Sequence, residues 1–325
     1  MTVPVIQSLQ AQNPRVKITV VTKHAFVPLF HHLHGGVTVH PFFPQGQHKG
    51  ILGIWRLTKE LRALNITAIA DLHSVLRSKI LKLMMLNYHW ESVVKDRKEK
   101  RNTVAKRQFK PLRTMHERYA DVFRKMGFKL DLSKGLLGSI KMQIPAVLKF
   151  NSTERLIGLA PFAGYPGKTY PIDLTKLLVQ KLERFGKVLL FGGGEKETSA
   201  LKQVEAQSEN AICVAGIFEL SEEIKLISNL DVMVAMDSSN AHMAAMLGVD
   251  VISIWGVTHP FLGFAPFGQP ESNNLVADRK TFPKIPTSVY GNKMPDGYER
   301  AIATVTPEMI EDLVEKRLKH HRNQL

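Results

Sequence analysis

The chain has 325 residues, 44% of them hydrophobic and 22% charged, a globular composition long enough for two domains of about 150 residues each. It lacks an apolar run of the roughly 18 residues that a membrane-spanning helix needs, and it does not open on a secretory signal pattern. We therefore expect a cytoplasmic protein. The single cysteine, Cys213, excludes an internal disulfide framework and a thiolate metal cluster, and its apolar surroundings predict a buried side chain.

The charge balance is the unusual feature of the composition. The chain has 44 Lys and Arg against 29 Asp and Glu, a net charge of +15, which predicts affinity for polyanions. Much of the excess lies in one segment, although such a run is equally typical of a solvated face or a mobile loop. No known nucleic-acid-binding motif is present, so we expect no nucleic-acid partner. The twelve basic residues of this segment are Arg77, Lys79, Lys82, Lys95, Arg97, Lys98, Lys100, Arg101, Lys106, Arg107, Lys110 and Arg113.

The N-terminal half alternates apolar runs with helical patterns. This rhythm predicts βαβ units and a parallel sheet. An amphipathic helix with basic residues follows Asp71, residues 100–126 read as helical, and residues 134–155 form the connector between the halves. The predicted strands are 17–22, 36–40 and 66–72, and the predicted helices between them are 24–33 and 51–64.

The C-terminal half repeats the alternation, which predicts a second Rossmann-like sheet. We place the domains at 1–150 and 151–325 and expect a long helix from Pro307 to about Lys319 to pack back on the first domain. The predicted strands are 156–163, 187–194, 211–216 and 232–236, with one more ending at Trp255, and the helices are 173–185, one from Glu195, 220–229 and 241–248.

The stretch from Asp231 to Pro260 carries the clearest functional signal. The apolar run 232–236 suits a buried parallel strand, and residues 237–240 are Asp, Ser, Ser and Asn, which all cap helices. The N–H groups of the helix that follows would point out at the carboxyl edge of the sheet, where open α/β folds bind anionic ligands. An ordinary capped turn explains the same spacing.

Three other strands of this half end in polar or glycine-rich segments. Residues 158–171 form a Gly- and Pro-rich loop in which Gly164 and Gly167 permit close backbone approach and Lys168 can neutralise an anion. Residues 191–197, FGGGEKE, form a glycine turn, and residues 255–260, WGVTHP, end the next strand. Taken alone, Lys168 is more often a surface lysine and His242 a packed core histidine. Neither GxGxxG nor GxxxxGK[ST] occurs.

The order and spacing of these segments resemble glycosyltransferase family 9, the heptosyltransferases of lipopolysaccharide assembly. The resemblance covers nearly the whole chain, because DLHSVLRS at 71–78 looks like the family's DLQxxxRS helix start. The matching positions in the C-terminal half are Lys168, Tyr170, Pro171, Gly192, Gly193, Gly194, Glu195, Asp237, Ser238, Ser239, His242, Trp255, Gly256, Thr258 and Pro260.

The resemblance implies an α/β protein of the GT-B fold, with two Rossmann-like domains whose parallel sheets face a cleft. The C-terminal domain would bind a nucleotide sugar, commonly ADP-heptose. Lys168 would bind the donor diphosphate or sugar, Asp237 would hydrogen-bond donor hydroxyls, and Gly193 and Glu195 would lie near the nucleoside. The other implied donor-binding residues are Gly164, Ser238, Ser239 and His242.

The chain departs from the family pattern in three places. Ser239 replaces the usual glycine of the elbow, and Ala163 and Gly164 replace hydroxyl residues. The family also begins with a strand ending in Gly-Asp, whose Asp is the general base, whereas this chain starts at MTVPVIQSL, already in the following helix. We expect the first N-terminal strand to be missing, its neighbours' edges to be unpaired, the family's catalytic Asp to lie before Met1 and the reading frame to begin upstream.

The resemblance therefore implies an inverting glycosyltransferase that moves heptose or a related sugar to a lipopolysaccharide core or related surface glycan. It needs neither metal nor other cofactor. Its partners would be the nucleotide sugar, an acidic glycolipid acceptor and the anionic inner face of the inner membrane. We expect Arg77, Lys79, Lys98, Lys100 and Arg101 to face the acceptor and membrane. The alternative is a catalytically silent homologue that binds donor; an NAD-linked enzyme is disfavoured by the missing glycine fingerprint.

Overall fold

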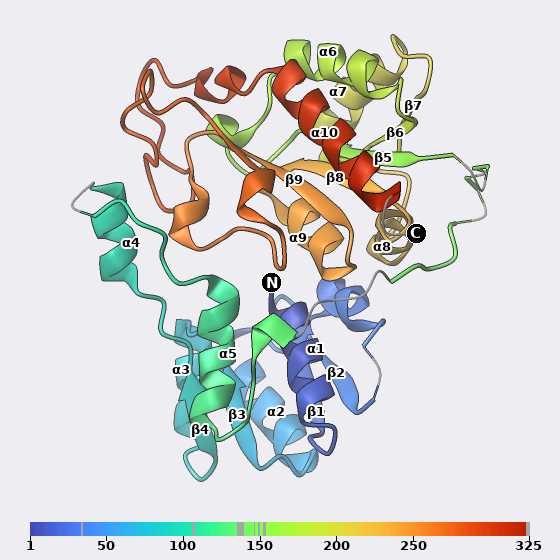
Figure 1. Ribbon diagram of the computed structural model, residues 1–325. Coiled ribbons are helices and arrows are strands. Elements are labelled where there is room, and N and C mark those ends of the chain that lie inside the picture. Colours follow the sequence, from blue (N-terminus) through green and yellow to red (C-terminus); the bar gives the residue numbers. More distant parts are fainter. Residues whose placement is uncertain are drawn as a thin grey trace. The chain divides into compact units, whose positions relative to one another are not determined.

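The computed structural model describes residues 1–33, 35–105, 108–134, 140–145, 147–148, 150–151 and 154–322. The chain forms two compact units (Figure 1). Unit 1 comprises Met1–Lys95 and Met115–Leu136, and unit 2 comprises Asp96–Thr114 and Leu137–Leu325. This division differs from a single break near residue 150, because residues 96–114 belong with the C-terminal unit.

Unit 1 holds two separate parallel strand pairs. Strand β1 (Ile18–Lys23) pairs with β2 (Val37–Phe42), and β3 (Ala68–Asp71) pairs with β4 (His89–Ser92). No strand among the described residues joins β1 to β3, so each pair keeps unpaired edges, as predicted. The helices of this unit are α1 (Thr2–Gln12), α2 (Gly50–Ala63), α3 (Leu76–Met84) and α5 (Met115–Lys125).

The core of unit 1 includes buried apolar residues of α1 and α5, such as Val5 and Phe123, and a cluster around α2. Phe42 of β2, Leu57 and Leu61 of α2, Met85 and Trp90 form one buried cluster. Every residue of β1 is either half-buried or exposed. The apolar runs at β1 and β3 thus form strands, as predicted, without reaching the burial of a complete sheet.

Unit 2 is built on one parallel sheet of six strands in the order β10-β9-β8-β5-β6-β7. The two middle strands, β5 (Leu156–Ala160) and β8 (Val232–Met236), are buried at every position. That burial explains their unbroken apolar sequence, because helices cover both faces. The flanking strands are β6 (Lys187–Leu190), β7 (Ala211–Cys213), β9 (Asp250–Trp255) and β10 (Asn274–Val276).

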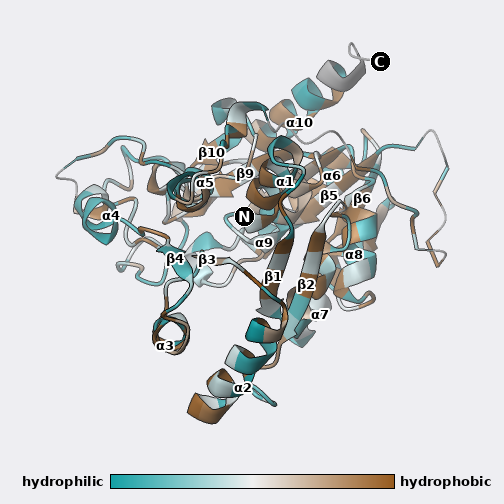
Figure 2. Ribbon diagram, turned by 90° about the horizontal axis from the view of Figure 1, so that it is seen from below, coloured by the Kyte–Doolittle hydropathy of each residue, from teal (hydrophilic) through white to brown (hydrophobic). Residues whose placement is uncertain are grey.

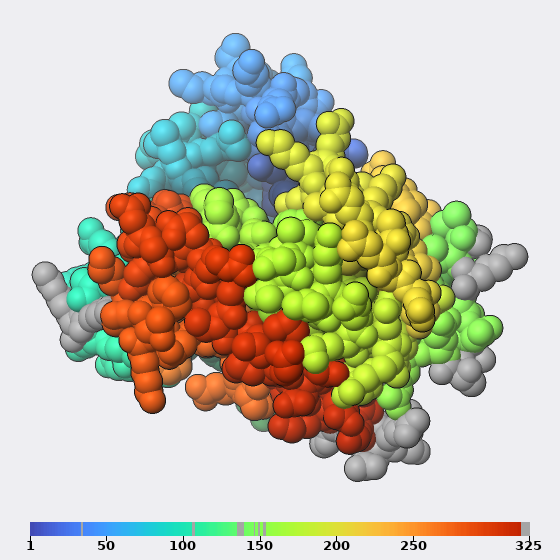
Figure 3. Space-filling view, turned by 90° about the horizontal axis from the view of Figure 1, so that it is seen from above, coloured from blue at the N-terminus to red at the C-terminus, as the bar shows by residue number. Residues whose placement is uncertain are grey.

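The helices of unit 2 include α4 (Arg97–Val104), α6 (Ile172–Leu182), α7 (Gly194–Glu205), α8 (Leu220–Ile227), α9 (Ser239–Met246) and α10 (Pro307–Arg322). The C-terminal helix α10 packs against α6, β8 and β9, and Figure 3 shows its red surface adjoining the green surface of the α6 region. Ile310 and Val314 of α10 are fully buried in the core of this unit. Cys213 is buried there as predicted.

The observed elements differ from the predicted ones at a few places. Residues 24–30 form a 3₁₀ helix that contains Pro28, rather than an α-helix over 24–33. The predicted helix over 100–126 is divided into α4 (Arg97–Val104) and α5, with Pro111 between them. Strands β4 and β10 have only four and three residues and were not predicted. Part of the predicted connector, and Lys106 and Arg107 of the basic segment, lie outside the described residues.

Candidate functional site

The four motifs of the C-terminal half lie at one edge of the unit 2 sheet. They follow β5, β6, β8 and β9, which are neighbouring strands in the order β9-β8-β5-β6. Because all four strands are parallel, their carboxyl ends meet at the same edge. The sequence order thus brings together segments that are up to about a hundred residues apart in the chain.

The strand order also changes direction at this edge. The chain runs from β5 outward through β6 to β7, and then returns to place β8 on the other side of β5. The β5–β8 boundary is therefore the topological switch point, where open α/β sheets leave a crevice that binds ligands. Lys168 follows β5 and Asp237 follows β8, so these two residues flank the switch point.

Lys168 and Asp237 are in direct contact. The Lys168 Nζ donates to the Asp237 backbone carbonyl at 2.9 Å and pairs with its carboxylate Oδ2 at 3.2 Å. The Thr258 hydroxyl, which is buried, donates to the same Oδ2 at 2.9 Å. Both charged side chains keep some exposure, 13% for Lys168 and 14% for Asp237. The cation is thus fixed at the edge of the sheet while remaining within reach of an anionic ligand.

Close backbone packing supports this contact. The Val257 N–H donates to the Gly167 carbonyl at 3.0 Å, and a Cβ at Gly256 would lie 2.2 Å from that oxygen. A Cβ at Gly167 would lie 2.7 Å from the Val257 side chain, so neither glycine can be replaced without movement. At Gly164, by contrast, a Cβ would meet nothing within 4 Å. Gly167 is thus required for packing within the protein, whereas the space beside Gly164 is open.

The elbow after β8 has the predicted helix start. Ser238 is the N-cap of α9, with extended backbone, and its Oγ is buried without a hydrogen-bond partner among the described residues. Ser239 begins the helix, is exposed and does not adopt a positive φ. The usual glycine is therefore not required for backbone conformation here. His242 lies one turn further along α9 and is half-buried.

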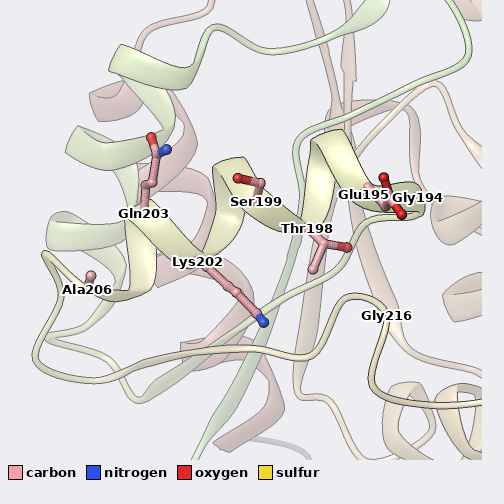
Figure 4. Close-up of a pocket in the computed structure, with 8 residues that line it drawn as sticks. All are labelled: Gly194, Glu195, Thr198, Ser199, Lys202, Gln203, Ala206 and Gly216. Carbon is pink, nitrogen blue, oxygen red and sulfur yellow. The ribbon is translucent and has the colours of Figure 1, made fainter.

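The glycine turn after β6 opens helix α7. Gly193 is the N-cap, Gly194 adopts a φ of +75°, and the Gly193 N–H donates to Glu197 Oε2 at 2.8 Å. Glu195 is exposed and lines an open depression of about 750 Å³ along α7. Figure 4 shows Thr198 and Lys202 extending from α7 toward the segment that carries Gly216. Gly164, Lys168 and the residues of the elbow do not line this depression.

The loop after β9 contacts the segment 96–114, which we call the strap and whose described residues are 96–105 and 108–114. The Leu112 N–H donates to the Phe261 carbonyl at 2.8 Å, and the ring of Phe109 lies 4.9 Å from that of His259. The guanidinium carbon of Arg279 lies 3.4 Å from the centre of the Phe109 ring. Burial, with a smaller repulsion from Arg279, lowers the pKa of His259 to about 4. His259 is therefore neutral near pH 7, and its Nδ1 accepts from the Phe261 N–H at 3.1 Å.

The five predicted acceptor- or membrane-facing cations are divided between the units. Arg77 and Lys79 belong to unit 1, and Lys98, Lys100 and Arg101 to unit 2. Four of them are exposed, but Lys100 is 4% exposed and its Nζ lies 4.3 Å from the ring centre of Phe264. Its prediction as a surface cation is wrong, because the long side chain packs inward over an aromatic ring.

For two residues of this edge, Thr258 and Tyr170, the sequence indicated a motif position but not the contact that the side chain makes. Thr258 was noted only as part of a motif, although its hydroxyl fixes Asp237. Tyr170 is fully buried, its hydroxyl donates to the Val305 carbonyl at 2.7 Å, and burial raises its pKa; its place is structural. In the described part of the chain, no group of three or more His, Cys, Asp or Glu side chains is placed to hold a metal ion. No helix there combines the length and apolar character needed to cross a membrane.

Comparisons with known proteins agree with this architecture. The model of the family described as glycosyltransferase family 9 (heptosyltransferase) matches residues 54–294. A lipooligosaccharide heptosyltransferase 2 of Haemophilus influenzae is 27% identical over 179 residues, 51% of this chain and 50% of that protein. The matched segment thus spans half the length of that curated relative.

Two solved structures share the fold. The family 9 glycosyltransferase of Veillonella parvula superposes with a TM-score of 0.75 at 17% identity, covering 98% of this chain and 93% of that one. The ADP-heptose lipopolysaccharide heptosyltransferase II of E. coli superposes with a TM-score of 0.69 at 19% identity, and the match covers 99% of this chain and 95% of that one. The α/β fold is the GT-B fold of these enzymes, as predicted. With the family model matching well over half of its length, the chain belongs to glycosyltransferase family 9, the heptosyltransferase family.

Proposed function

We propose that this protein transfers heptose, or a closely related sugar, from ADP-heptose to a lipopolysaccharide core or related surface glycan, with inversion at the anomeric carbon. The observation that carries the proposal is the Lys168–Asp237 contact at the switch point, beside the N-terminus of α9. A fixed cation and free helical N–H groups are the donors that a diphosphate needs. The buried Ser238 Oγ, which has no partner among the described residues, adds a hydroxyl that a bound phosphate oxygen could satisfy.

In the proposed reaction the acceptor hydroxyl attacks the anomeric carbon in line, and the nucleoside diphosphate leaves with the bonding electrons. Negative charge develops on the departing phosphate oxygen. Lys168 Nζ and the first-turn N–H groups of α9 would stabilise that charge, so the transfer requires no metal ion. Asp237 has two roles here: its carboxylate fixes Lys168, and its remaining lone pairs can accept from donor hydroxyls.

The nucleoside would occupy the edge near the glycine turn. The depression beside α7 presents the Glu195 carboxylate, the Thr198 hydroxyl and the Lys202 ammonium, and is wide enough for a nucleoside at about 750 Å³ (Figure 4). A carboxylate that accepts from two ribose hydroxyls is the recognition chemistry expected at such a position. Gly193 and Gly194 offer open space above their Cα atoms for close approach of a ligand.

The acceptor side of the proposal rests on charge. An acidic glycolipid at the cytoplasmic face of the inner membrane would meet a protein of net charge +15 whose Lys98 and Arg101 are exposed. We place the protein there as a peripheral partner of the anionic surface. The relatives named for heptose transfer to lipopolysaccharide or lipooligosaccharide support this choice of acceptor.

Donor binding tests the site. We expect Lys168→Ala and Asp237→Ala each to weaken ADP-heptose binding, measured by calorimetry, by at least about 1 kcal/mol, or roughly fivefold, since each removes a charge-assisted contact. Lys187→Ala is the matched control, because Lys187 is also an ion-paired lysine, 3.4 Å from Glu154, but it begins β6 at the opposite edge of the sheet. Unchanged affinity in both site variants would refute this placement of the donor.

Turnover tests the reaction separately. Release of ADP from ADP-heptose in the presence of a lipopolysaccharide core acceptor is the expected result for a transferase. Donor binding without ADP release, under conditions in which a known heptosyltransferase turns over, would identify a donor-binding protein that does not transfer sugar.

A further inference from the structure

Helices α2 and α3 of unit 1 carry large apolar side chains on their outer faces. The two helices lie in contact, and Arg62 of α2 donates to the Met84 carbonyl of α3 at 2.6 Å. Soluble proteins seldom gather so many exposed apolar side chains on two adjacent helices. The exposed fractions are 67% for Ile51, 81% for Leu52, 51% for Trp55, 75% for Leu76, 69% for Leu83 and 72% for Leu86, which follows α3.

The exposed apolar residues are not part of the core-facing stripe. In α2 the buried residues include Ile54, Leu57 and Leu61, which repeat at helical spacing and face the core. Leu52 and Trp55 point away from this stripe, and Ile51, which is also exposed, lies at its flank. Figure 2 shows one end of α2 in the brown of apolar residues. Helix α3 has no fully buried residue; Leu81 packs against the core cluster of this unit, whereas packing within the protein does not explain the exposed Leu76 and Leu83.

Basic side chains accompany this apolar face. The two helices together contain six cations and one acid, Glu60, whose carboxylate is held by His40 at 2.9 Å and His48 at 3.1 Å. The Lys59 Nζ lies 3.7 Å from the centre of the Trp55 ring, so charge and apolar surface share one patch. The cations are Arg56, Lys59, Arg62, Arg77, Lys79 and Lys82.

We propose that this face, which we call the α2–α3 face, inserts its apolar side chains into the interfacial region of an anionic lipid bilayer while its cations contact the headgroups. Exposed leucine and tryptophan interspersed with Lys and Arg is the composition of interfacial helices. A second copy of the chain is a poor occupant, because two such faces would bring twelve cations against two acids. The inference rests on the proposed function only in that a lipid bilayer is chosen as the partner of this face.

Vesicle binding with intrinsic fluorescence tests the proposal directly. Of the three tryptophans, Trp90 is 9% exposed and Trp255 1%, so a spectral change on binding must come chiefly from Trp55. Adding vesicles of equal parts phosphatidylglycerol and phosphatidylcholine should shift the emission to shorter wavelength, and the shift should vanish in Trp55→Phe. Binding should weaken in about 0.5 M salt, where charges are screened within a few ångströms.

A leucine variant separates insertion from simple charge attraction. Leu52→Gln combined with Leu83→Gln should reduce sedimentation with these vesicles at least about tenfold, since each removes a side chain that leaves water on binding. Leu177→Gln is the matched control, because Leu177 is 50% exposed on α6 of unit 2. Sedimentation that is unchanged in the double variant, or the absence of any fluorescence shift, would overturn the proposal.

Two further measurements keep this result distinct from the proposed function. The double variant should bind ADP-heptose like the parent chain, because α2 and α3 belong to unit 1 and the donor residues to unit 2. Lost donor binding at Lys168→Ala alongside intact vesicle binding would support both inferences independently. Concentration-dependent self-association that is abolished by Leu52→Gln and Leu83→Gln, with no vesicle binding, would show that a second copy covers the face and would refute the lipid assignment.

Discussion

Gly164 and Gly167 lie three residues apart in one loop, yet their surroundings differ completely. A side chain at Gly167 would meet Val257 and Met294 within 3.0 Å, whereas one at Gly164 would meet nothing. Gly167 is therefore a packing requirement of the loop that presents Lys168. Gly164 leaves open space, which is what a ligand-binding loop needs on its outer side.

These two glycines give a stability prediction. Gly167→Ala should lower the free energy of unfolding by about 1–3 kcal/mol, the usual cost of overpacking a close contact. Gly164→Ala is the matched change and should stay within about 0.5 kcal/mol of the parent. Chemical denaturation of both variants measures the difference. Equal free energies of unfolding would show that the loop after β9 moves to accommodate the added methyl group without loss of stability.

The side chains of the site were only partly predictable. The sequence placed Lys168 and Asp237 at strand ends on one edge of a parallel sheet, but their direct contact was not predicted. Thr258 could not be predicted as the third member, since its hydroxyl direction depends on the close backbone contact at Gly167 and Gly256. Lys100 was misplaced for a related reason: its sequence neighbours do not reveal that its ammonium group lies over the ring of Phe264.

At the scale of elements, the strap is the part that sequence patterns did not foresee. Apolar runs and helical periodicity predicted most strands and helices of unit 2 to within a few residues, although β6 and β7 have only four and three residues. Strand β4, with the sequence HWES, contains one apolar residue and so gives no apolar run. The strap's attachment depends on contacts of Phe109 and Leu112 with residues about 150 positions later, and local propensity carries no information about them.

The burial of His259 beside the strap leads us to expect that the stability of the protein depends on pH. Burial lowers the pKa of His259 from 6.5 to about 4, so the unfolded chain takes up a proton at this residue before the folded chain does. Stability is therefore full above pH 6.5 and falls as the pH drops from 6.5 toward 4. In His259→Asn, which keeps an acceptor for the Phe261 N–H, the loss of unfolding free energy between pH 7 and pH 4.5 should be smaller than in the parent.

A second histidine variant serves as the control for this prediction. The side chain of His89 is 54% exposed, so His89→Asn should show the same dependence of stability on pH as the parent. Denaturant unfolding at several pH values measures all three proteins. If the free energy of unfolding changed with pH in the same way in the parent and in His259→Asn, the prediction that burial lowers the pKa of His259 would be wrong.

At the scale of the whole molecule, the two units differ in how completely their sheets are buried. Strands β5 and β8 are buried at every residue, while β1 is half-buried or exposed throughout. Amide hydrogens open by local fluctuations more readily where few apolar contacts cover a strand. We expect exchange in β1 and β3 to be at least about tenfold faster than in β5 and β8. Peptide-resolved hydrogen exchange measures this, and equal protection would contradict it.

The assignment of residues 96–114 to unit 2 has a consequence for protein engineering. The chain leaves unit 1 after Lys95, re-enters it at Met115 and leaves it again after residue 136, so the units are not consecutive in sequence. A chimera that exchanges donor specificity between family members by one junction near residue 150 would pair the Phe261 loop with a foreign strap. Functional exchange requires the strap to travel with the C-terminal unit, as a discontinuous module with additional junctions near residues 95 and 115.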